Sequence, residues 1–190
     1  MTIEYDLYRF NGKRGLMSAI DTTIKKAAFR YIVYLRWYQY AHSKKYFFLS
    51  KTISRIAFHN LSIRLNLDIH KNTKIGKGFV IYHPGAIAIN QAASLGNNCT
   101  IYHGVTIGME FRGKRQGCPT IGDKVWIGPN ATIVGKVSVG NNVLIAPGAF
   151  VNCDVPSNSI VIGNPARIIP NDNATEDYIT RTELDQFEKS

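Results

Sequence analysis

Cysteine, acidic residues and long apolar runs are all scarce in this sequence. Its three cysteines, Cys99, Cys118 and Cys153, are odd in number and show no paired metal-binding spacing. This argues against a disulfide framework and against a metal site, and it suits a reducing compartment. No apolar run approaches the length of a membrane span, and the acidic opening Met-Thr-Ile-Glu-Tyr-Asp is unlike a signal peptide. We therefore expect a cytoplasmic protein without a metal cofactor.

Acidic residues are outnumbered, at 13 against 23 Lys and Arg. The basic excess is N-terminal, since residues 1–66 carry twelve Lys and Arg against three acids, while residues 170–190 carry two against six. Thirteen of the 21 aromatic residues also precede residue 67. Apolar spacing predicts one helix from about residue 18 to 38 and a second over residues 44–61.

Two interpretations of this basic, aromatic region stay open. Residues 18–61 could contact an anionic membrane surface, which would place the protein at the inner face of the membrane. Alternatively, the aromatic residues pack between helices, against the rest of the chain or against a partner subunit. No groove-reading motif accompanies the charge, so we do not expect nucleic acid as a partner.

An aliphatic residue returns at every sixth position through the middle of the chain. Glycine often follows it, and the fifth place of the repeat is small or β-branched. The step is eight between Ile87 and Leu95 and fourteen between Ile107 and Ile121, which indicates insertions of two and eight residues. The series is Ile69, Ile75, Ile81, Ile87, Leu95, Ile101, Ile107, Ile121, Ile127, Ile133, Val139, Ile145 and Val151. This period predicts a β-helix of hexapeptide repeats, in which stacked coils share one apolar core.

The repeat and its motifs resemble the hexapeptide acyltransferases, and the serine acetyltransferase branch most closely, over roughly residues 65–169. The motifs run from Leu67 to Gly76 (LDIHKNTKIG) and over Tyr82-His83-Pro-Gly, Gly104-Val-Thr-Ile-Gly108 and Gly163-Asn-Pro-Ala-Arg167. The resemblance implies a left-handed parallel β-helix with three repeats per coil, although the general crossover rule would predict a right-handed one. It also implies a homotrimer, with pairing of trimers as a further option.

Two histidines should stack on one edge of the β-helix. Because of the two-residue insertion, Ile81 and Ile101 lie one coil apart, so His83 and His103 occupy the same place in consecutive coils, about 5 Å apart at the backbone. Asp68 precedes His83 by fifteen residues, slightly less than a coil, so we expect its carboxylate near the imidazole. In the family that the chain resembles, a histidine in this motif is the catalytic base, and an aspartate fifteen residues earlier orients it.

The chemistry explains these residue types. Transfer of an acetyl group from a thioester to a hydroxyl needs a base of near-neutral pKa, and imidazole is one. An aspartate would fix its tautomer and stabilise the imidazolium. His103 and Tyr82 are expected to contact the acceptor. The alternative for His83 is a corner residue with a structural hydrogen bond.

Residues 109–120 form the long insertion, whose glycines and three cations predict an exposed loop of functional type. In serine acetyltransferases a loop of this length ends in Arg-His-Pro and helps to hold the amino acid. This chain has Gly117-Cys118-Pro119 instead, so both of those side chains are absent. We expect Arg115 and Cys118 to line the acceptor site. Cys118 as a nucleophile is an alternative, but an ordinary thiol would be mostly protonated.

The resemblance further implies that acetyl-CoA lies along the solenoid edge, between subunits. Arg167 would lie near the nucleotide end, where a cation suits a phosphate. The other residues expected to border it are Met109, Gly128, Pro129, Ala146 and Pro147. For each of these positions the alternative is a repeat corner without a ligand.

We therefore predict an N-terminal helical region over residues 1–66, a β-helix acetyltransferase domain over residues 67–169, and an acidic tail over residues 170–190 that is a short helix or a frayed end. The predicted activity is acetyl-CoA-dependent O-acetylation of a sugar hydroxyl in surface polysaccharide biosynthesis, because the short N-terminal region resembles capsule and exopolysaccharide proteins of this branch. The alternative is serine O-acetyltransferase of cysteine biosynthesis. A third hypothesis is a non-catalytic trimeric scaffold.

Overall fold

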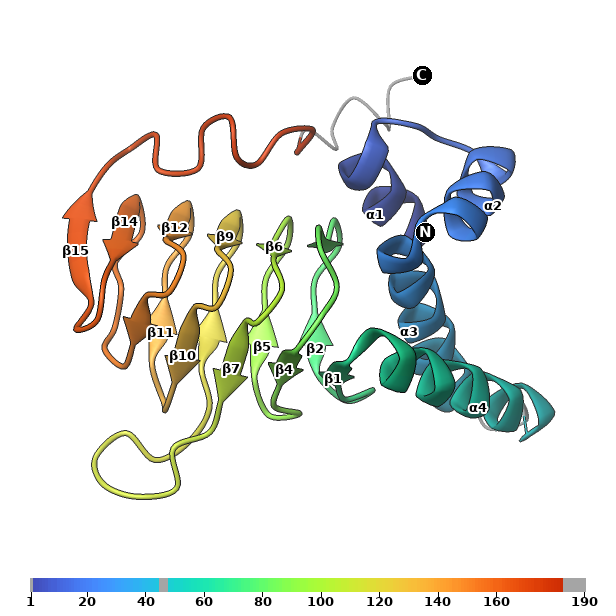
Figure 1. The fold of residues 1–190 in the computed structure, drawn as a ribbon, viewed down its shortest axis with the longest axis horizontal. Coiled ribbons are helices and arrows are strands. Elements are labelled where there is room, and N and C mark those ends of the chain that lie inside the picture. Colours follow the sequence, from blue (N-terminus) through green and yellow to red (C-terminus); the bar gives the residue numbers. More distant parts are fainter. Residues whose placement is uncertain (1, 45–47, 183–190) are drawn as a thin grey trace.

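A β-helix packs end-on against a group of helices in the computed structural model, which describes residues 2–44 and 48–182 (Figure 1). Strands from successive coils stack side by side, and in the described residues they form three sheets. All strand pairs in these sheets are parallel except that of β14 with β15. The mainly β fold with an N-terminal helical region is therefore confirmed.

Each sheet forms one side of the solenoid. Sheet A contains β1 (Leu67–Ile69), β4 (Ile87–Ile89), β7 (Thr106–Gly108), β10 (Thr132–Val134) and β13 (Phe150–Val151). Sheet B contains β2 (Lys74–Ile75), β5 (Ser94–Leu95), β8 (Thr120–Ile121) and β11 (Ser138–Val139). Sheet C contains β3 (Val80–Ile81), β6 (Thr100–Ile101), β9 (Val125–Ile127), β12 (Val143–Ile145), β14 (Ser159–Ile162) and β15 (Arg167–Pro170).

Strand register confirms the repeat and the size of both interruptions, but it moves the first interruption to another corner. Ala88 pairs with Thr106, eighteen residues on, and Thr132 pairs with Phe150 at the same interval. The partner of Leu67 is Ile87, twenty residues on, and that of Thr106 is Thr132, twenty-six residues on. The eight-residue insertion lies between Ile107 and Ile121, as predicted. The position predicted for the two-residue insertion, between Ile87 and Leu95, is wrong. Ile69 pairs with Ile89 twenty residues on, whereas Ile89 pairs with Ile107 only eighteen on, so these two residues lie in the corner between Ile81 and Ile89.

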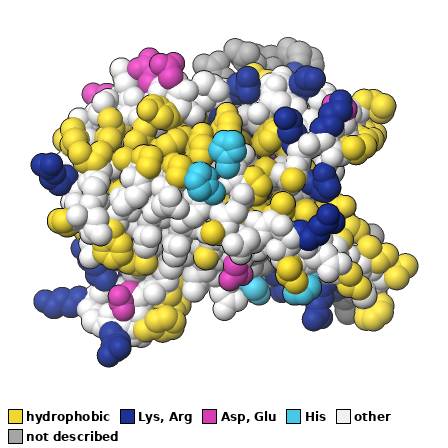
Figure 2. All heavy atoms as spheres, viewed as in Figure 1, with side chains coloured by type: hydrophobic (Ala, Val, Ile, Leu, Met, Phe, Trp, Pro, Cys, Tyr) yellow, Lys and Arg dark blue, Asp and Glu magenta, His cyan; other side chains and the backbone are white. Residues whose placement is uncertain are grey.

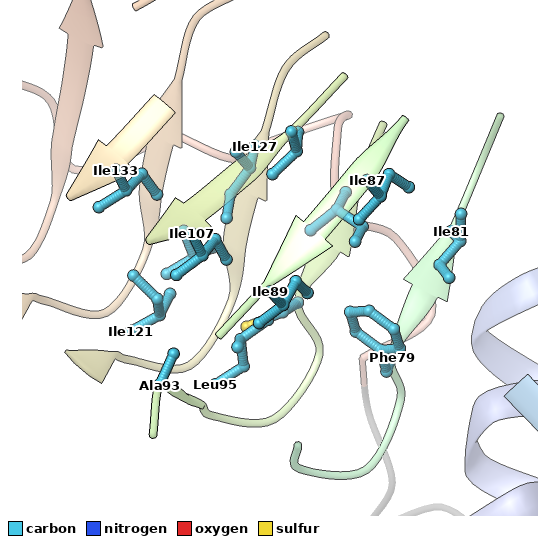
Figure 3. Packing of buried hydrophobic residues seen from close by; sticks show 14 of the residues in the cluster. Phe79, Ile81, Ile87, Ile89, Ala93, Leu95, Ile107, Ile121, Ile127 and Ile133 are labelled. Carbon is cyan, nitrogen blue, oxygen red and sulfur yellow. The ribbon is translucent and has the colours of Figure 1, made fainter. Parts of the chain in front are cut away.

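The repeating aliphatic residues build the core. Every member of the predicted series is buried except Ile75, which is half-buried. The small residues at the fifth place are buried as well, and Figure 3 shows isoleucines of neighbouring coils pointing into the same interior. Full burial of each such side chain contributes roughly 1.5–3 kcal/mol. Because every coil repeats the pattern, these contributions form one continuous column.

A ladder of polar side chains closes the corner between sheets B and C. The backbone N–H of Lys77 donates to Asn97 Oδ1, that of Asn97 to Asp123 Oδ1, and that of Asp123 to Asn141 Oδ1, at 3.1, 2.6 and 2.7 Å. The N–H of Asn141 continues the series to Ser157 Oγ at 2.9 Å. Each rung satisfies a corner amide that no strand partner reaches.

The helical region is more divided than the sequence predicted. Its helices are α1 (Thr2–Asn11), α2 (Leu16–Lys25), α3 (Ala27–Ser43) and α4 (Phe48–Leu65). The single helix expected over residues 18–38 is wrong, because Lys26 is extended and separates α2 from α3. Arg30 stabilises this break, donating to the carbonyl oxygens of Thr23 and Ile24 at 2.9 and 2.7 Å, where a cation suits a helix C-terminus. The second helix continues to Leu65, four residues further than expected, and residues 45–47 of that prediction lie outside the described residues.

Buried ionic groups attach the helices to the first coil. Asp6 of α1 and Arg36 of α3 form an ion pair of 2.9 Å that is almost completely buried. Arg36 also donates to the carbonyl oxygens of Ile75 and Gly76, and Asp6 accepts the N–H of Phe79. Arg9 is buried beside the second coil, where it donates to Thr100 Oγ1 at 2.8 Å and to the Thr180 carbonyl. Burial lowers the pKa of its guanidinium to about 10, a value at which it stays charged near neutral pH.

After β15 the chain turns back along the outer face of sheet C (Figure 1). Ala174 and Ile179 cover Trp126 and Leu144, and together they form a second, smaller apolar cluster. Asn142 holds this segment by accepting a hydrogen bond of 2.6 Å from Thr175 Oγ1 and by donating one of 2.7 Å to the Asp172 carbonyl. The part of the acidic tail that the structure describes after β15, residues 171–182, forms turns and irregular chain instead of the short helix considered for it, and residues 183–190 lie outside the described residues.

Candidate active site

Two histidines stack on the edge where sheet C turns into sheet A. Ile81 of β3 pairs with Ile101 of β6, and His83 and His103 each follow two residues later. Their ring centroids are 6.3 Å apart, and both side chains are exposed. Figure 2 shows two neighbouring histidine side chains in the middle of one face. The predicted stacking is confirmed, and it leaves both imidazoles open to a ligand.

The same edge carries four of the residues that we expected to border acetyl-CoA. Ile101 pairs with Ile127, which pairs in turn with Ile145, so Pro129 and Pro147 follow the two histidines at equivalent corner positions. Gly128 and Ala146 precede these prolines. A side chain at Gly128 would come within 2.7 Å of the Pro147 nitrogen and 2.8 Å of the Trp126 ring, so only glycine fits there. With a strand spacing of about 4.8 Å, the edge from His83 to Pro147 is roughly 14 Å long.

Asp68 does not meet His83 within one chain. Neither a hydrogen bond nor an ion pair joins these two residues, both of which the structure describes. Asp68 lies on β1, where it pairs with Ala88, and Ala88 is five residues beyond His83. Asp68 thus belongs to a strand of sheet A, whereas His83 lies in the corner between β3 and β4. Asp68 instead borders a hollow of about 770 Å³ that Lys51, Arg55 and other residues of α4 line.

An aromatic row that sequence reasoning missed runs beside the histidines. Tyr82 and Tyr102 are stacked at 5.3 Å with an interplanar angle of 8°, and the centroid of Tyr102 is 5.8 Å from that of His83. The row continues through Trp126, 5.1 Å from Tyr102, to Tyr178 of the returning segment at 5.0 Å. Burial raises the pKa of the Tyr102 phenol, and Tyr82 adds to the effect. The sequence contained the information needed to predict this stacking, because Tyr82 and Tyr102 are twenty residues apart, as His83 and His103 are.

The long loop lies at a different corner, between sheets A and B. Glu110 and Gly117 exchange two backbone hydrogen bonds of 3.0 Å at its base, and Arg115 forms an exposed ion pair with Asp154 at 3.4 Å. Burial raises the pKa of the half-buried Cys118 thiol, which makes it a weaker nucleophile at neutral pH. Within one chain, Arg115 and Cys118 are therefore apart from the histidine edge.

The remaining two predicted residues lie away from the histidine edge. Met109 is half-buried at the start of the loop, directly after β7. Arg167 is exposed on β15, where it pairs with Ile162 of β14. Neither of them borders the histidines. As for metals, the described residues contain no group of three or more His, Cys, Asp or Glu side chains able to hold an ion.

Comparisons with known proteins identify the family. Residues 118–153 match the family model of the bacterial transferase hexapeptide (six repeats). The chain is 35% identical over 133 residues to a serine acetyltransferase of Helicobacter pylori, covering 69% of this chain and 74% of that protein. The serine acetyltransferase structure from Neisseria gonorrhoeae superposes with a TM-score of 0.73 at 30% sequence identity. The structure of serine acetyltransferase from Brucella abortus in complex with coenzyme A superposes with a TM-score of 0.71 at 27% sequence identity.

Each of these two structural matches covers 90% of this chain and 66% of the solved chain, so the relatives of known structure are longer. The agreement extends over the β-helix and the helices before it, and it confirms the left-handed β-helix that we expected from the sequence. The chain therefore belongs to the serine acetyltransferase family of hexapeptide-repeat acyltransferases, and it is an acetyltransferase.

Proposed function

We propose that this protein transfers an acetyl group from acetyl-CoA to a hydroxyl, with His83 as the general base. The observation that carries the proposal is the exposed imidazole pair at the start of an edge that continues into Pro129 and Pro147. In the reaction, the hydroxyl oxygen attacks the thioester carbonyl while His83 Nε2 or Nδ1 takes its proton. The tetrahedral intermediate then expels the coenzyme A thiolate, which receives that proton from the imidazolium. The coenzyme A bound in a related structure supports acetyl-CoA as the donor.

We further propose that the site is completed between subunits of a homotrimer. Asp68 and the loop bearing Arg115 and Cys118 lie at other places on the same solenoid. A neighbouring copy could bring them to the histidine edge, which one chain alone does not do. Mixed trimers test this, because His83→Ala and Asp68→Ala chains would restore activity when combined only if each active site uses residues of two subunits.

For the acceptor we propose serine, which the comparisons favour over the sugar hydroxyl that we expected from the sequence. The relatives and structures described above are serine acetyltransferases. They do not support the capsule or exopolysaccharide subtype. Serine would present its hydroxyl to His83, and His103 lies at the position nearest to that imidazole along the edge.

A sugar hydroxyl remains a second candidate on two specific observations. The loop has Gly117-Cys118, where serine acetyltransferases have the Arg-His pair that holds the amino acid. Tyr82 and Tyr102 also offer a nearly coplanar aromatic surface beside His83, and such a surface suits the apolar face of a ring better than a small amino acid.

One assay separates these possibilities. Release of coenzyme A is measured with purified protein, acetyl-CoA and either L-serine or a panel of nucleotide sugars and glycan intermediates. Turnover with serine supports the main proposal, and turnover with a sugar alone supports the second. Absence of coenzyme A release with every acceptor of either class would favour the scaffold hypothesis.

A further inference from the structure

The helix α2 exposes its apolar side. Its residues Leu16, Met17, Ile20 and Ile24 lie along one stripe, and Leu16, Met17 and Ile24 are 76%, 78% and 68% exposed. The one fully buried side chain among the ten residues of this helix is a threonine, Thr22. An amphipathic helix normally turns this stripe toward the core. Here the stripe faces outward, beside an apolar groove of about 460 Å³ that α1, α2 and α3 line.

Helix α4 repeats the arrangement. Leu49, Ile53, Ile56 and Ile63 recur at helical spacing on one exposed side, and Phe48 at its start is 82% exposed. Both helices lie at the end of the molecule away from β15 (Figure 1). Figure 2 shows hydrophobic side chains at the right-hand margin in both places, with Lys and Arg near them. We call the exposed apolar side chains of α2 and α4, together with Lys13, Lys26 and Arg55, the helical end surface.

The excess of positive charge in the helical region indicates what kind of partner this surface can bind. Residues 12–65 carry eleven Lys and Arg against a single acid, Asp21. One of the eleven, Arg36, is buried and paired with Asp6, so it adds no charge to this surface. The one acid is paired with Lys25 at 2.5 Å. Lys13 and Lys26, which flank α2 in the sequence, and Arg55 of α4 are exposed. Two copies of such a surface would bring like charges together, and this opposes self-association through it.

We propose that the helical end surface docks onto an anionic lipid bilayer. Apolar side chains flanked by cations are the composition of helices that lie in the interface plane, with the apolar side among the acyl chains and the cations at the headgroups. None of the helices in the described residues is long and apolar enough to cross a membrane, so contact with one leaflet is the mode that fits. The histidine edge lies on the side of the solenoid, where His83 and His103 are exposed.

The test is co-sedimentation of the full chain with vesicles of phosphatidylcholine alone and of phosphatidylcholine mixed with phosphatidylglycerol. We expect binding to the anionic vesicles only, and release as salt rises. The double variant Met17→Ser/Ile24→Ser is expected to lower partitioning about tenfold, since it removes two exposed apolar groups. Charge reversal in the variant Lys13→Glu/Lys26→Glu is expected to lower partitioning to anionic vesicles by at least about fivefold per cation.

Two controls keep the result specific. Phe111→Ser removes a side chain that is 73% exposed on the distant loop, and Lys124→Glu reverses an exposed cation of the solenoid. Neither variant should change vesicle binding. Failure to bind anionic vesicles, or equal binding to neutral ones, would overturn the proposal. So would a change of molecular mass in vesicle-free solution caused by Met17→Ser/Ile24→Ser, because a second copy of the chain would then be the occupant.

Discussion

Replacing Asp6 with alanine should loosen the helical region from the solenoid. Asp6 is completely buried, and its carboxylate accepts two hydrogen bonds from Arg36, at 2.9 and 3.3 Å, and one from the Phe79 N–H at 2.9 Å. Removal leaves a buried guanidinium without its counter-ion and a buried amide without an acceptor. Breaking such a pair from one side typically costs about 3–5 kcal/mol. We therefore expect a loss of about 4 kcal/mol, which is a large share of the stability of a domain.

The location of the effect is as informative as its size. In a repeat protein each unit contacts mainly its neighbours, so the damage should stay near α1, α3 and the first coil. Hydrogen exchange should therefore speed up in α1 and α3 and remain slow in β9 and β12. The midpoint temperature of thermal unfolding, followed by far-UV circular dichroism, should fall by roughly 8–16 °C for this loss of stability.

Two matched variants complete the experiment. Glu4→Ala removes an exposed carboxylate from the same helix and should change stability by less than about 0.5 kcal/mol. Asp6→Leu/Arg36→Met removes both charges, and it should cost less than Asp6→Ala alone. A loss below about 1 kcal/mol for Asp6→Ala, or accelerated exchange spread evenly over all coils, would refute the reasoning.

Other predictions follow from single residues. His83→Ala should lower kcat/KM for coenzyme A release by about 10²–10⁴-fold; near wild-type turnover would remove His83 from the mechanism. Ile107→Ala, at a fully buried core position, should cost about 2–5 kcal/mol of unfolding free energy in urea titrations, and a smaller loss would mean that the coils collapse around the gap. Cys99 is fully buried and burial raises its thiol pKa to about 12, so a thiol reagent should modify Cys118 and Cys153 first, with Cys99 reacting only after unfolding. Because the folded pKa of Cys99 lies above the ordinary thiol value of 9.0, the unfolded state releases its proton first, and stability should fall as the pH rises from about 9 toward 12. Cys99→Ala should flatten that fall, and an unchanged slope would assign it to other groups.

The sequence by itself determined the β-helix, because the six-residue period is a local property that every coil repeats. The position of the eight-residue insertion follows from the same count, and so does the stacking of His83 on His103, since a residue's place in a coil decides which edge it occupies. The count put the two-residue insertion one corner too late, because Ile87 and Ile89 are both aliphatic and only the strand pairing shows that Ile89 holds the repeat position. The course of the aliphatic core could be predicted in the same way, residue by residue.

Only the tertiary structure decided which side chains face one another across a corner or between the helices and the solenoid. Asp68 precedes His83 by only fifteen residues in the sequence. In the structure, however, Asp68 belongs to strand β1 of sheet A, whereas His83 lies in a corner. The break at Lys26 depends on Arg30 capping α2, and the burial of Asp6 depends on Arg36 from another helix. The exposed stripe of α2 has the same periodicity as a buried one. Its direction depends on what packs against the helix, which the spacing of apolar residues does not contain.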